Sequence, residues 1–252
     1  TVYVGHAGKN IAGADWVVRS SAVLDDNPEV IAARLAQIPV YKRADFLGWL
    51  MQDRIGIAIA GTHGKTTTTA MMAWTLYALS QDPAFIVGGV MNNLGVNARA
   101  GAGDPFVIEA DEYDRMFLGL QPRYAIITNV EHDHPDCYPT FDKMMEAFEL
   151  FVELLPEQGV LVACADDPVA RRLGELRCAA GGPTVFYGLT GLSGAAGDWF
   201  ADDIQTDERG GMRFNARRGD EAAGAVRVNQ VGKHNVQNAL AALAAATACG
   251  TP

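Results

Sequence analysis

The segment Ile55–Ala60 reads IGIAIA and is followed directly by Gly61–Thr66, which reads GTHGKT. An apolar run of this length is too short for a buried helix and is typical of a buried strand in a parallel sheet. A glycine-rich stretch between a strand and a helix is typical of a phosphate-binding loop, because its backbone N–H groups can surround phosphate oxygens at the helix N-terminus. The two segments therefore predict an α/β fold with a phosphate site at the end of the strand.

Helices and strands alternate along the chain, as is typical of a mainly parallel α/β sheet. We expect helices at residues 27–37, 43–52, 66–79 and 141–155. We expect strands at residues 1–4, 15–18, 55–60, 85–87, 106–108, 125–128 and 160–163. Beyond Tyr187, the alternating runs 211–216 and 225–231 indicate hairpins at a sheet edge, and residues 191–197 indicate a loop. A last, alanine-rich helix begins near Asn235.

The composition excludes several classes of protein. The chain has 252 residues, of which 49% are hydrophobic and 20% charged, so it can bury a large core and is not intrinsically disordered. It carries 20 Lys and Arg against 30 Asp and Glu, a net charge of −10, which argues against binding to a nucleic-acid backbone. Any phosphate must therefore be bound by local groups.

Targeting and cysteine signals point to the cytoplasm. No apolar run reaches the roughly 18 residues of a membrane span, and no signal-peptide pattern begins at Thr1. The four cysteines form no C-x-x-C pair, which suits reduced thiols. We therefore expect a cytoplasmic protein with no membrane or nucleic-acid partner. The sequence leaves open whether it is a monomer or a homodimer.

The loop after the first buried strand carries the groups that a nucleoside triphosphate needs. Lys65 is placed to reach the β- and γ-phosphates, and the Thr66 hydroxyl is placed to bind Mg²⁺. The pattern departs from the standard one, which has a glycine at the position of Ile59. The alternative is a glycine-rich strand-to-helix turn without a ligand, and His63 alone is typical of a loop or packing residue.

An acidic cluster follows the predicted strand at residues 106–108. Four carboxylates lie within residues 109–114, where ligands collect at the carboxyl end of a parallel strand. Oxygen ligands suit Mg²⁺, and Glu109 is favoured because it lies nearest the strand. For any one of these acids, a solvated loop is an equal alternative.

A second polar cluster, residues 128–138, follows the predicted strand at 125–128. His132, His134 and Asp136 form an H-x-H-x-D pattern, which by itself resembles the zinc motif of metallo-β-lactamase-like hydrolases. The phosphate loop upstream favours a nucleotide-linked Mg²⁺ site instead. Histidines that only cap a loop are the third possibility.

The segment GKHNVQN at residues 232–238 precedes the last helix. Asn235 and Asn238 are three residues apart and share a helix face. Their amides both donate and accept, which suits an adenine edge, although helix capping explains Asn235 equally well.

Four motifs in this order together resemble the Mur ligase family. They are GTHGKTTTTA at residues 61–70, EADE at 109–112, TNVEHDH at 128–134 and GKHNVQN at 232–238. Further similarity at residues 20–28 and 57–60 extends the resemblance over nearly the whole chain.

The resemblance implies an enzyme of three domains. These are a UDP-sugar-binding Rossmann-like domain, a central P-loop ATPase domain with a mainly parallel sheet, and a C-terminal domain that receives an amino acid. By this comparison, residues 1–52 are the C-terminal part of the first domain and residues 53–252 are the central ATP-binding domain. The C-terminal ligase domain is then absent, and the family's glycine-rich loop for the UDP diphosphate is expected before Thr1.

The resemblance also implies roles for individual residues, with ATP and Mg²⁺ as cofactors. Lys65, Glu109 and His134 are the implied catalytic residues; Thr66 and Glu109 bind one Mg²⁺ and His134 a second. The implied nucleotide-binding residues are Gly61, Thr62, His63, Gly64, Lys65, Thr66, Thr67, Asn235 and Asn238. Several relatives use a carbamylated lysine after the histidine motif, but residues 144–155 contain no lysine, and Lys143 is left unassigned.

The implied reaction is ATP-dependent amide formation between L-alanine and the lactyl carboxylate of UDP-N-acetylmuramate, through an acyl phosphate, in peptidoglycan precursor synthesis. The nearest alternative attaches the tripeptide L-Ala-γ-D-Glu-diaminopimelate to the same UDP-sugar in wall recycling; the short run at residues 115–124 favours L-alanine. A P-loop switch or kinase is a rival of another class, for which the sequence has no separate signature. The chain alone is also expected to bind nucleotide without turnover.

Overall fold

The computed structural model describes residues 1–189 and 197–251. All but the last residue of the loop expected at 191–197 lie outside these ranges. The α-helices are α1 (Pro28–Leu35), α2 (Arg43–Met51), α3 (Lys65–Ala78), α4 (Phe141–Glu153), α5 (Pro168–Ala179) and α6 (Lys233–Ala248), and the 3-10 helices are η1 (Gly8–Ile11) and η2 (Tyr113–Gly119). The strands are β1 (Val17–Arg19), β2 (Val40–Lys42), β3 (Ile55–Ala60), β4 (Ala84–Met91), β5 (Val96–Arg99), β6 (Pro105–Glu109), β7 (Tyr124–Ile127), β8 (Val160–Cys164), β9 (Thr184–Gly188), β10 (Trp199–Thr206), β11 (Met212–Arg218) and β12 (Glu221–Val228).

A ten-stranded sheet forms the body of the molecule, in the order β12-β11-β10-β9-β8-β7-β3-β6-β4-β5. The strands from β10 through β4 run parallel, and β5, β11 and β12 are antiparallel additions at the two edges. From β3 the chain crosses toward β4, whereas from β7 it crosses the other way to β8 and β9. The order therefore reverses between the neighbours β3 and β7, and ligands collect at such a switch point in open α/β sheets.

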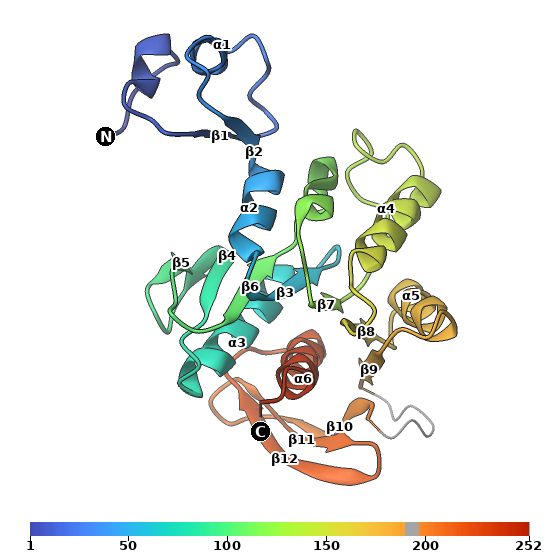
Figure 1. Cartoon of the computed structure of the whole chain (residues 1–252). Helices are drawn as coiled ribbons and strands as arrows, with labels where there is room; N and C mark the ends of the chain where they lie inside the picture. Colours follow the sequence, from blue (N-terminus) through green and yellow to red (C-terminus); the bar gives the residue numbers. More distant parts are fainter. Residues whose placement is uncertain (190–196, 252) are drawn as a thin grey trace.

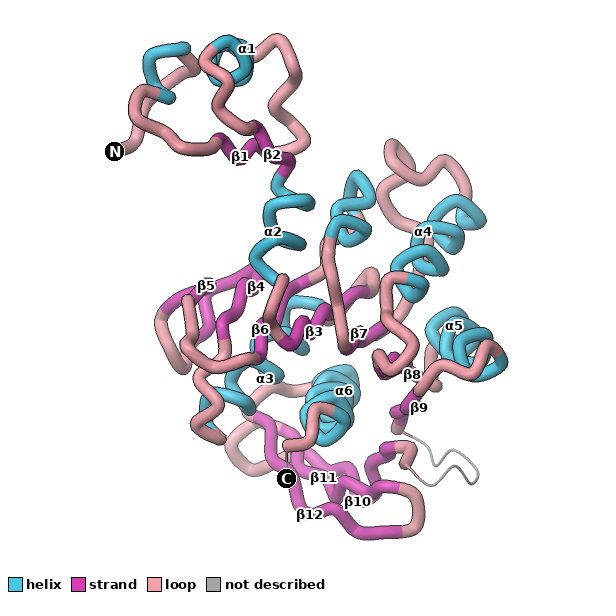
Figure 2. Tube along the Cα trace, viewed as in Figure 1, coloured by secondary structure: helices cyan, strands magenta, loops and turns pink. Residues whose placement is uncertain are grey.

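The central strands are buried because helices cover both faces of the sheet. All of β7 is buried, and so are β3, β6 and β8 except for one end residue each. Helices α3 and α6 pack together on one face, and α4 and α5 lie on the other (Figures 1 and 2). Right-handed crossovers require this division, since the chain leaves β3 and β7 in opposite directions. The mainly parallel α/β fold is confirmed.

The N-terminal residues form a small separate unit. Strands β1 and β2 pair in parallel as their own two-stranded sheet, and α2 joins this unit to the large sheet (Figure 1). Helix α2 packs against η2 at a point where two glycines are required. A Cβ on Gly48 would lie 2.0 Å from the Gly119 carbonyl oxygen, and one on Gly119 would lie 2.9 Å from the Ala44 Cβ.

The sequence-based expectations agree with most elements. The expected helices correspond to α1 to α4 and α6, and the expected hairpin strands to β11 and β12. The expected strand at residues 1–4 is wrong: these residues form no strand, and Val2 and Val4 are 94% and 104% exposed. A strand needs a pairing partner, and none of the described strands pairs with this segment.

Two features are absent from the described residues: a membrane-spanning helix and a disulfide bond. None of the helices in residues 1–189 and 197–251 combines the length and apolarity of a membrane span. Cys137, Cys164, Cys178 and Cys249 are all free thiols.

Candidate functional site: a phosphate loop at the switch point

The loop after β3 depends on glycine at two positions. Gly61 and Gly64 have φ of +134° and +83°, which non-glycine residues rarely adopt. A Cβ on Gly61 would lie 2.1 Å from Thr128 Oγ1, and one on Gly64 would lie 2.7 Å from Asn238 Oδ1. Helix α3 begins at once with Lys65, so its free N–H groups face the loop. The backbone therefore has the form of an anion-binding cradle, as the sequence predicts.

The loop after β7 fastens this cradle from the neighbouring strand. Thr62 N and His63 N donate to the backbone and side-chain oxygens of Asn129, both at 2.9 Å. Thr128 Oγ1 donates to His63 O at 2.6 Å, and Thr62 Oγ1 accepts from Glu131 N at 2.8 Å. The His63 side chain itself is exposed, with Nε2 3.6 Å from a Glu131 carboxylate oxygen. His63 thus contributes to the loop through its backbone.

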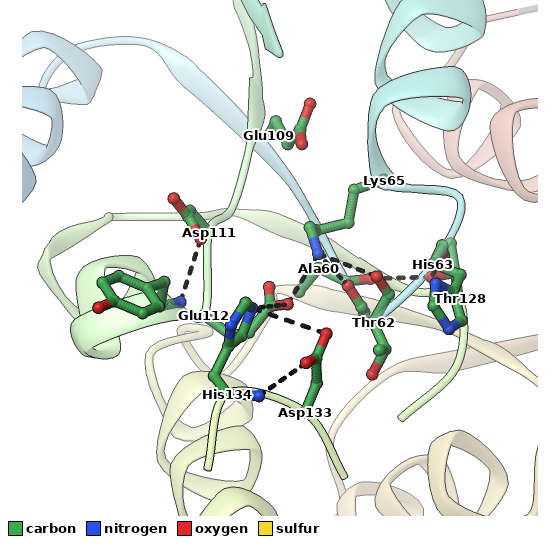
Figure 3. A network of polar contacts seen from close by, with 12 residues as sticks. Ala60, Thr62, His63, Lys65, Glu109, Asp111, Glu112, Thr128, Asp133 and His134 are labelled. Atoms are coloured by element: carbon green, nitrogen blue, oxygen red, sulfur yellow. Dashed lines mark hydrogen bonds and ion pairs between the residues drawn. The ribbon is translucent and has the colours of Figure 1, made fainter. Parts of the chain in front are cut away.

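Lys65 folds back over the loop (Figure 3). Its Nζ donates to Gly61 O at 2.6 Å, Thr62 O at 3.2 Å and Glu112 Oε1 at 2.8 Å. The ammonium group therefore lies among the loop carbonyls, where an incoming phosphate would meet it.

Thr66 and Glu109 form a pair of oxygen ligands beside the loop. Thr66 Oγ1 donates to Glu109 Oε1 at 3.1 Å, and Gly88 N donates to Glu109 Oε2 at 2.8 Å. A Cβ on Gly88 would lie 2.6 Å from the same carboxylate oxygen, so glycine is needed for this approach. A hydroxyl and a carboxylate at a phosphate loop are the donor set that Mg²⁺ prefers, so these residues fit the predicted metal.

Glu112 and His134 extend the polar network from β6 to the loop after β7. Glu112 is 1% exposed, and its Oε1 lies 3.7 Å from His134 Nε2 as well as 2.8 Å from Lys65 Nζ. Burial raises the pKa of the Glu112 carboxyl, and the nearby Lys65 ammonium opposes that rise. His134 has a left-handed backbone, with φ of +53°, and its Nε2 also lies 3.7 Å from Asp133 Oδ2.

The H-x-H-x-D side chains do not converge. His132 Nε2 lies 2.8 Å from Tyr138 O, whereas Asp136 Oδ2 accepts from the Tyr113 hydroxyl at 2.9 Å. No group of three His, Cys, Asp or Glu side chains in the described parts of the chain is placed to hold a metal ion by itself. The geometry therefore gives the zinc-hydrolase hypothesis no support.

Asn235 and Asn238 lie at the start of α6, under the phosphate loop. Both are buried: Asn235 Nδ2 donates to Val231 O at 2.8 Å, and Asn238 Nδ2 donates to Asn235 Oδ1 at 3.3 Å. Asn238 Oδ1 also faces Gly64. Their amides are thus bonded within the chain, and a role in adenine binding stays a prediction.

A cleft of about 360 Å³ opens directly beside the loop, from Thr66 and Thr67 outward. One side is apolar, with Ala70, Met71 and Trp74 of α3. The other side carries the polar side chains Asn92, Asn93, Arg227, Asn229 and Gln230. The cleft therefore combines an apolar wall with hydrogen-bonding groups next to the phosphate loop.

Three residues that the sequence analysis did not single out hold the predicted site residues in place. Thr128 and Asn129 fasten the loop, and Glu112 binds Lys65. Thr128 and Asn129 follow a predicted strand beside the loop, a signal that could have found them. Glu112 had no such signal, because only the fold shows which of the four acids near residue 110 turns inward.

Two family models match the chain. The model described as Mur ligase middle domain matches residues 59–246, and the model described as Mur ligase family, catalytic domain, matches residues 1–55. UDP-N-acetylmuramate–L-alanine ligase of Bordetella petrii is 45% identical over 256 residues, covering 100% of this chain and 53% of that protein. The chain thus spans about half the length of the curated relatives it matches.

Two solved structures have the same fold. UDP-N-acetylmuramate:L-alanyl-gamma-D-glutamyl-meso-diaminopimelate ligase from Neisseria meningitides matches with a TM-score of 0.83 and 28% identity, covering 99% of this chain and 79% of that one. UDP-N-acetylmuramate-alanine ligase from Thermotoga maritima matches with a TM-score of 0.77 and 30% identity, covering 98% of this chain and 54% of that one. Since the middle-domain model alone matches well over half of the residues, the chain belongs to the Mur ligase family.

Proposed function

We propose that the chain is the ATP-binding part of a cytoplasmic ligase that joins L-alanine to the lactyl carboxylate of UDP-N-acetylmuramate. The observation that carries the proposal is the meeting of three loops at the switch point. The carboxyl ends of β3, β6 and β7 and the segments that follow them supply Lys65, Glu109 and His134, and Glu112 links Lys65 to His134. Alanine ligases that are 45% and 46% identical over almost all of the chain support this choice of substrate.

The proposed division of the chain follows the family. Residues 1–52 would be the end of the UDP-sugar-binding domain, and residues 53–252 would be the central ATP-binding domain. The separate β1-β2 sheet and the single linking helix α2 support this boundary. The amino acid would be received by a further domain.

ATP would place its phosphates in the loop and its nucleoside in the adjoining cleft. Of the nine nucleotide-binding residues implied by the resemblance, Thr66 and Thr67 line this cleft, and the apolar wall at Trp74 suits a base. The adenine assignment of Asn238 can be tested by comparing ATP with GTP in the Asn238→Ala variant. A larger loss for ATP supports base recognition, whereas equal losses assign Asn238 to bracing Gly64.

The residues beside the loop would hold Mg²⁺. Thr66 and Glu109 supply two oxygens 3.1 Å apart, and His134 supplies a ring nitrogen for a second ion. Bound Mg²⁺ would supply positive charge to the phosphate oxygens. Lys143 forms an ion pair with Glu146 at 2.7 Å, and we propose no metal role for it.

Chemistry explains why this reaction needs ATP. A free carboxylate does not form an amide with an amine at neutral pH, because oxide is a poor leaving group. Transfer of the γ-phosphoryl group to the lactyl carboxylate gives an acyl phosphate and ADP, and the amine of L-alanine then displaces phosphate. The chain contributes positioning by the loop N–H groups and charge stabilisation by Lys65, and no side chain acts as a nucleophile.

The tripeptide ligation of wall recycling is the second candidate. Its supporting observation is the TM-score of 0.83 with the Neisseria ligase. Sequence identity favours L-alanine, at 45% with an alanine ligase against 28% with that ligase.

The test is ADP release by the full-length protein with Mg-ATP and UDP-N-acetylmuramate, with L-alanine in one tube and the tripeptide in another. We expect turnover with L-alanine. Turnover only with the tripeptide would move the protein to recycling and leave the ATP site as proposed. If neither tube releases ADP although the protein binds ATP, the proposed substrates are contradicted.

A further inference from the structure

The ammonium group of Lys65 has no free N–H in this structure. It donates to Gly61 O, Thr62 O and Glu112 Oε1, and a lysine ammonium has three N–H groups. A phosphate can therefore bind Lys65 only if one of these bonds breaks. The bond to Glu112 is the charged one, and phosphate and carboxylate compete for the same ammonium.

The carboxylate of Glu112 depends on this bond. The side chain is 1% exposed, and its Oε2 is buried with no hydrogen-bond partner among the described residues. An ionised carboxylate that is removed from water is unstable unless an opposite charge or donors compensate it. Lys65 is the compensating charge, so another hydrogen-bond donor must replace it at Glu112 when the ammonium group moves away.

The backbone fixes Glu112 in this position. Glu112 O accepts from the hydroxyl of the buried Tyr138 at 2.5 Å and from Arg115 N at 2.9 Å. Asp114 and Arg115 follow with φ of +52° and +54°, a strained pair of left-handed residues. These contacts therefore fix the backbone in the position that directs the Glu112 carboxylate inward.

His134 is the donor in reach. Its Nε2 lies 3.7 Å from Glu112 Oε1, and the ring is held edge-on to Tyr113 with centroids 5.2 Å apart. Asp133 Oδ2 lies at the same distance of 3.7 Å from this nitrogen and is partly exposed, so water can solvate it when the ring turns away. A rotation of the His134 ring that shortened this 3.7 Å separation would bring Nε2 within hydrogen-bond distance of Glu112 Oε1.

We propose that Glu112 is a positioning residue that holds Lys65 in the empty site and exchanges it for His134 when a nucleotide binds. The exchange makes the lysine available to the phosphates and fixes the orientation of His134 in the same step. The inference rests on the proposed function, because it takes Lys65 as the phosphate ligand. It gives Glu112 a role that neither the loop motif nor the metal ligands require.

The test is calorimetric titration of the chain and its Glu112→Gln variant with ATP, ADP and inorganic tripolyphosphate. A neutral amide competes less for Lys65, so we expect all three ligands to bind roughly tenfold more tightly to the variant. Unchanged or weaker binding would overturn the exchange. Wild-type binding that is absent altogether would contradict the proposed function instead.

The matched control is Glu131→Gln. Glu131 carries the same charge near the loop, but its side chain is 68% exposed and its carboxylate faces His63 rather than Lys65. We expect less than a twofold change in affinity, because exposed charges are screened. Equal tightening in the two variants would show a general charge effect and would also overturn the proposal.

A second readout follows Lys65 directly. Acetylation by an amine-reactive ester, located by peptide mass spectrometry, should increase several-fold at Lys65 in nucleotide-free Glu112→Gln, and ATP should suppress it. A purely structural role for Glu112 does not predict this pattern. If the amide variant does not fold, Glu112→Met keeps the length and burial without the charge, and the same affinity and labelling changes are expected of it.

Discussion

Two regions of the sheet are held by different kinds of contact: the carboxyl ends of the central strands, which we call the loop edge, and the strands β10 to β12, which we call the antiparallel end. At the loop edge, the cradle after β3 is fastened by half-buried hydrogen bonds from Thr128 Oγ1 and Lys65 Nζ, and at its exposed rim by one from Asn129 Nδ2. At the antiparallel end, β10 to β12 pack one face against α6 and carry partly exposed ion pairs on the other, such as Arg217 with Asp202. Breaking a buried polar contact leaves an unsatisfied group, whereas an exposed pair is replaced by water. Single substitutions should therefore act strongly at the first region and weakly at the second.

The largest effect is expected at Gly61. Gly61→Ala forces a side chain into φ of +134° and places Cβ 2.1 Å from Thr128 Oγ1, so the cradle cannot keep its shape. We expect ATP affinity to fall by at least about 100-fold in calorimetry. The control is Gly210→Ala at the antiparallel end, where φ is +83° but no atom lies within 4 Å of the new Cβ. A similar loss of ATP affinity in both variants would mean that backbone strain at a left-handed glycine, and not the close contact with Thr128, causes the loss.

The next effect concerns the metal. Glu109→Gln removes the carboxylate that accepts from Thr66 Oγ1 and Gly88 N. We expect the gain in ATP affinity on adding Mg²⁺ to shrink roughly tenfold, while affinity without Mg²⁺ changes little. Asp111→Asn, which removes a charge from the same segment, should keep the Mg²⁺ dependence. An unaltered Mg²⁺ dependence in the Glu109 variant would remove Glu109 from the proposed ligands.

The two regions also differ in how far the sequence predicts them. The cradle shape at residues 61–66 was predictable because such a loop needs glycines at fixed spacing, and spacing is visible in a sequence; the role of these residues in nucleotide binding stays a prediction. The strands β11 and β12 were recognised by alternation, but β9 and β10 were not: β9 is a short apolar run without alternation, and β10 carries two adjacent charges, Asp202 and Asp203. The inward turn of Glu112 depends on Tyr138 and on the left-handed Asp114 and Arg115, which no local pattern reveals.

A smaller effect is expected at the hydrogen bond by which Thr128 holds the phosphate loop. Thr128→Val removes a buried hydroxyl that donates to His63 O at 2.6 Å, which should destabilise the fold by about 1 kcal/mol and weaken ATP binding a few-fold. Thr68→Val is the matched control, because the Thr68 hydroxyl is buried without a hydrogen-bond partner in the part of the chain that the structure describes. Thermal unfolding should show Thr68→Val to be neutral or stabilising. Destabilisation of both variants to the same extent would count against a special role for the Thr128 bond.

The smallest effect is expected at the antiparallel end, and it depends on pH. Asp207 accepts from the Arg227 side chain and from Arg209 N, and these bonds, led by that to Arg227, lower the pKa of Asp207 in the folded protein. A carboxyl whose pKa is lowered by folding adds stability above its unfolded value of about 3.9, and this contribution is lost as the pH falls through the folded pKa. Asp207→Asn should therefore lower Tm by no more than about 2 °C at pH 7, because the Arg227 side chain is 41% exposed and water screens the pair, and the difference should vanish in acid. A difference that persists or grows at low pH would show that Asp207 acts through its turn geometry and not through its charge, and the contrast with the buried fastening of the loop edge would then need another cause.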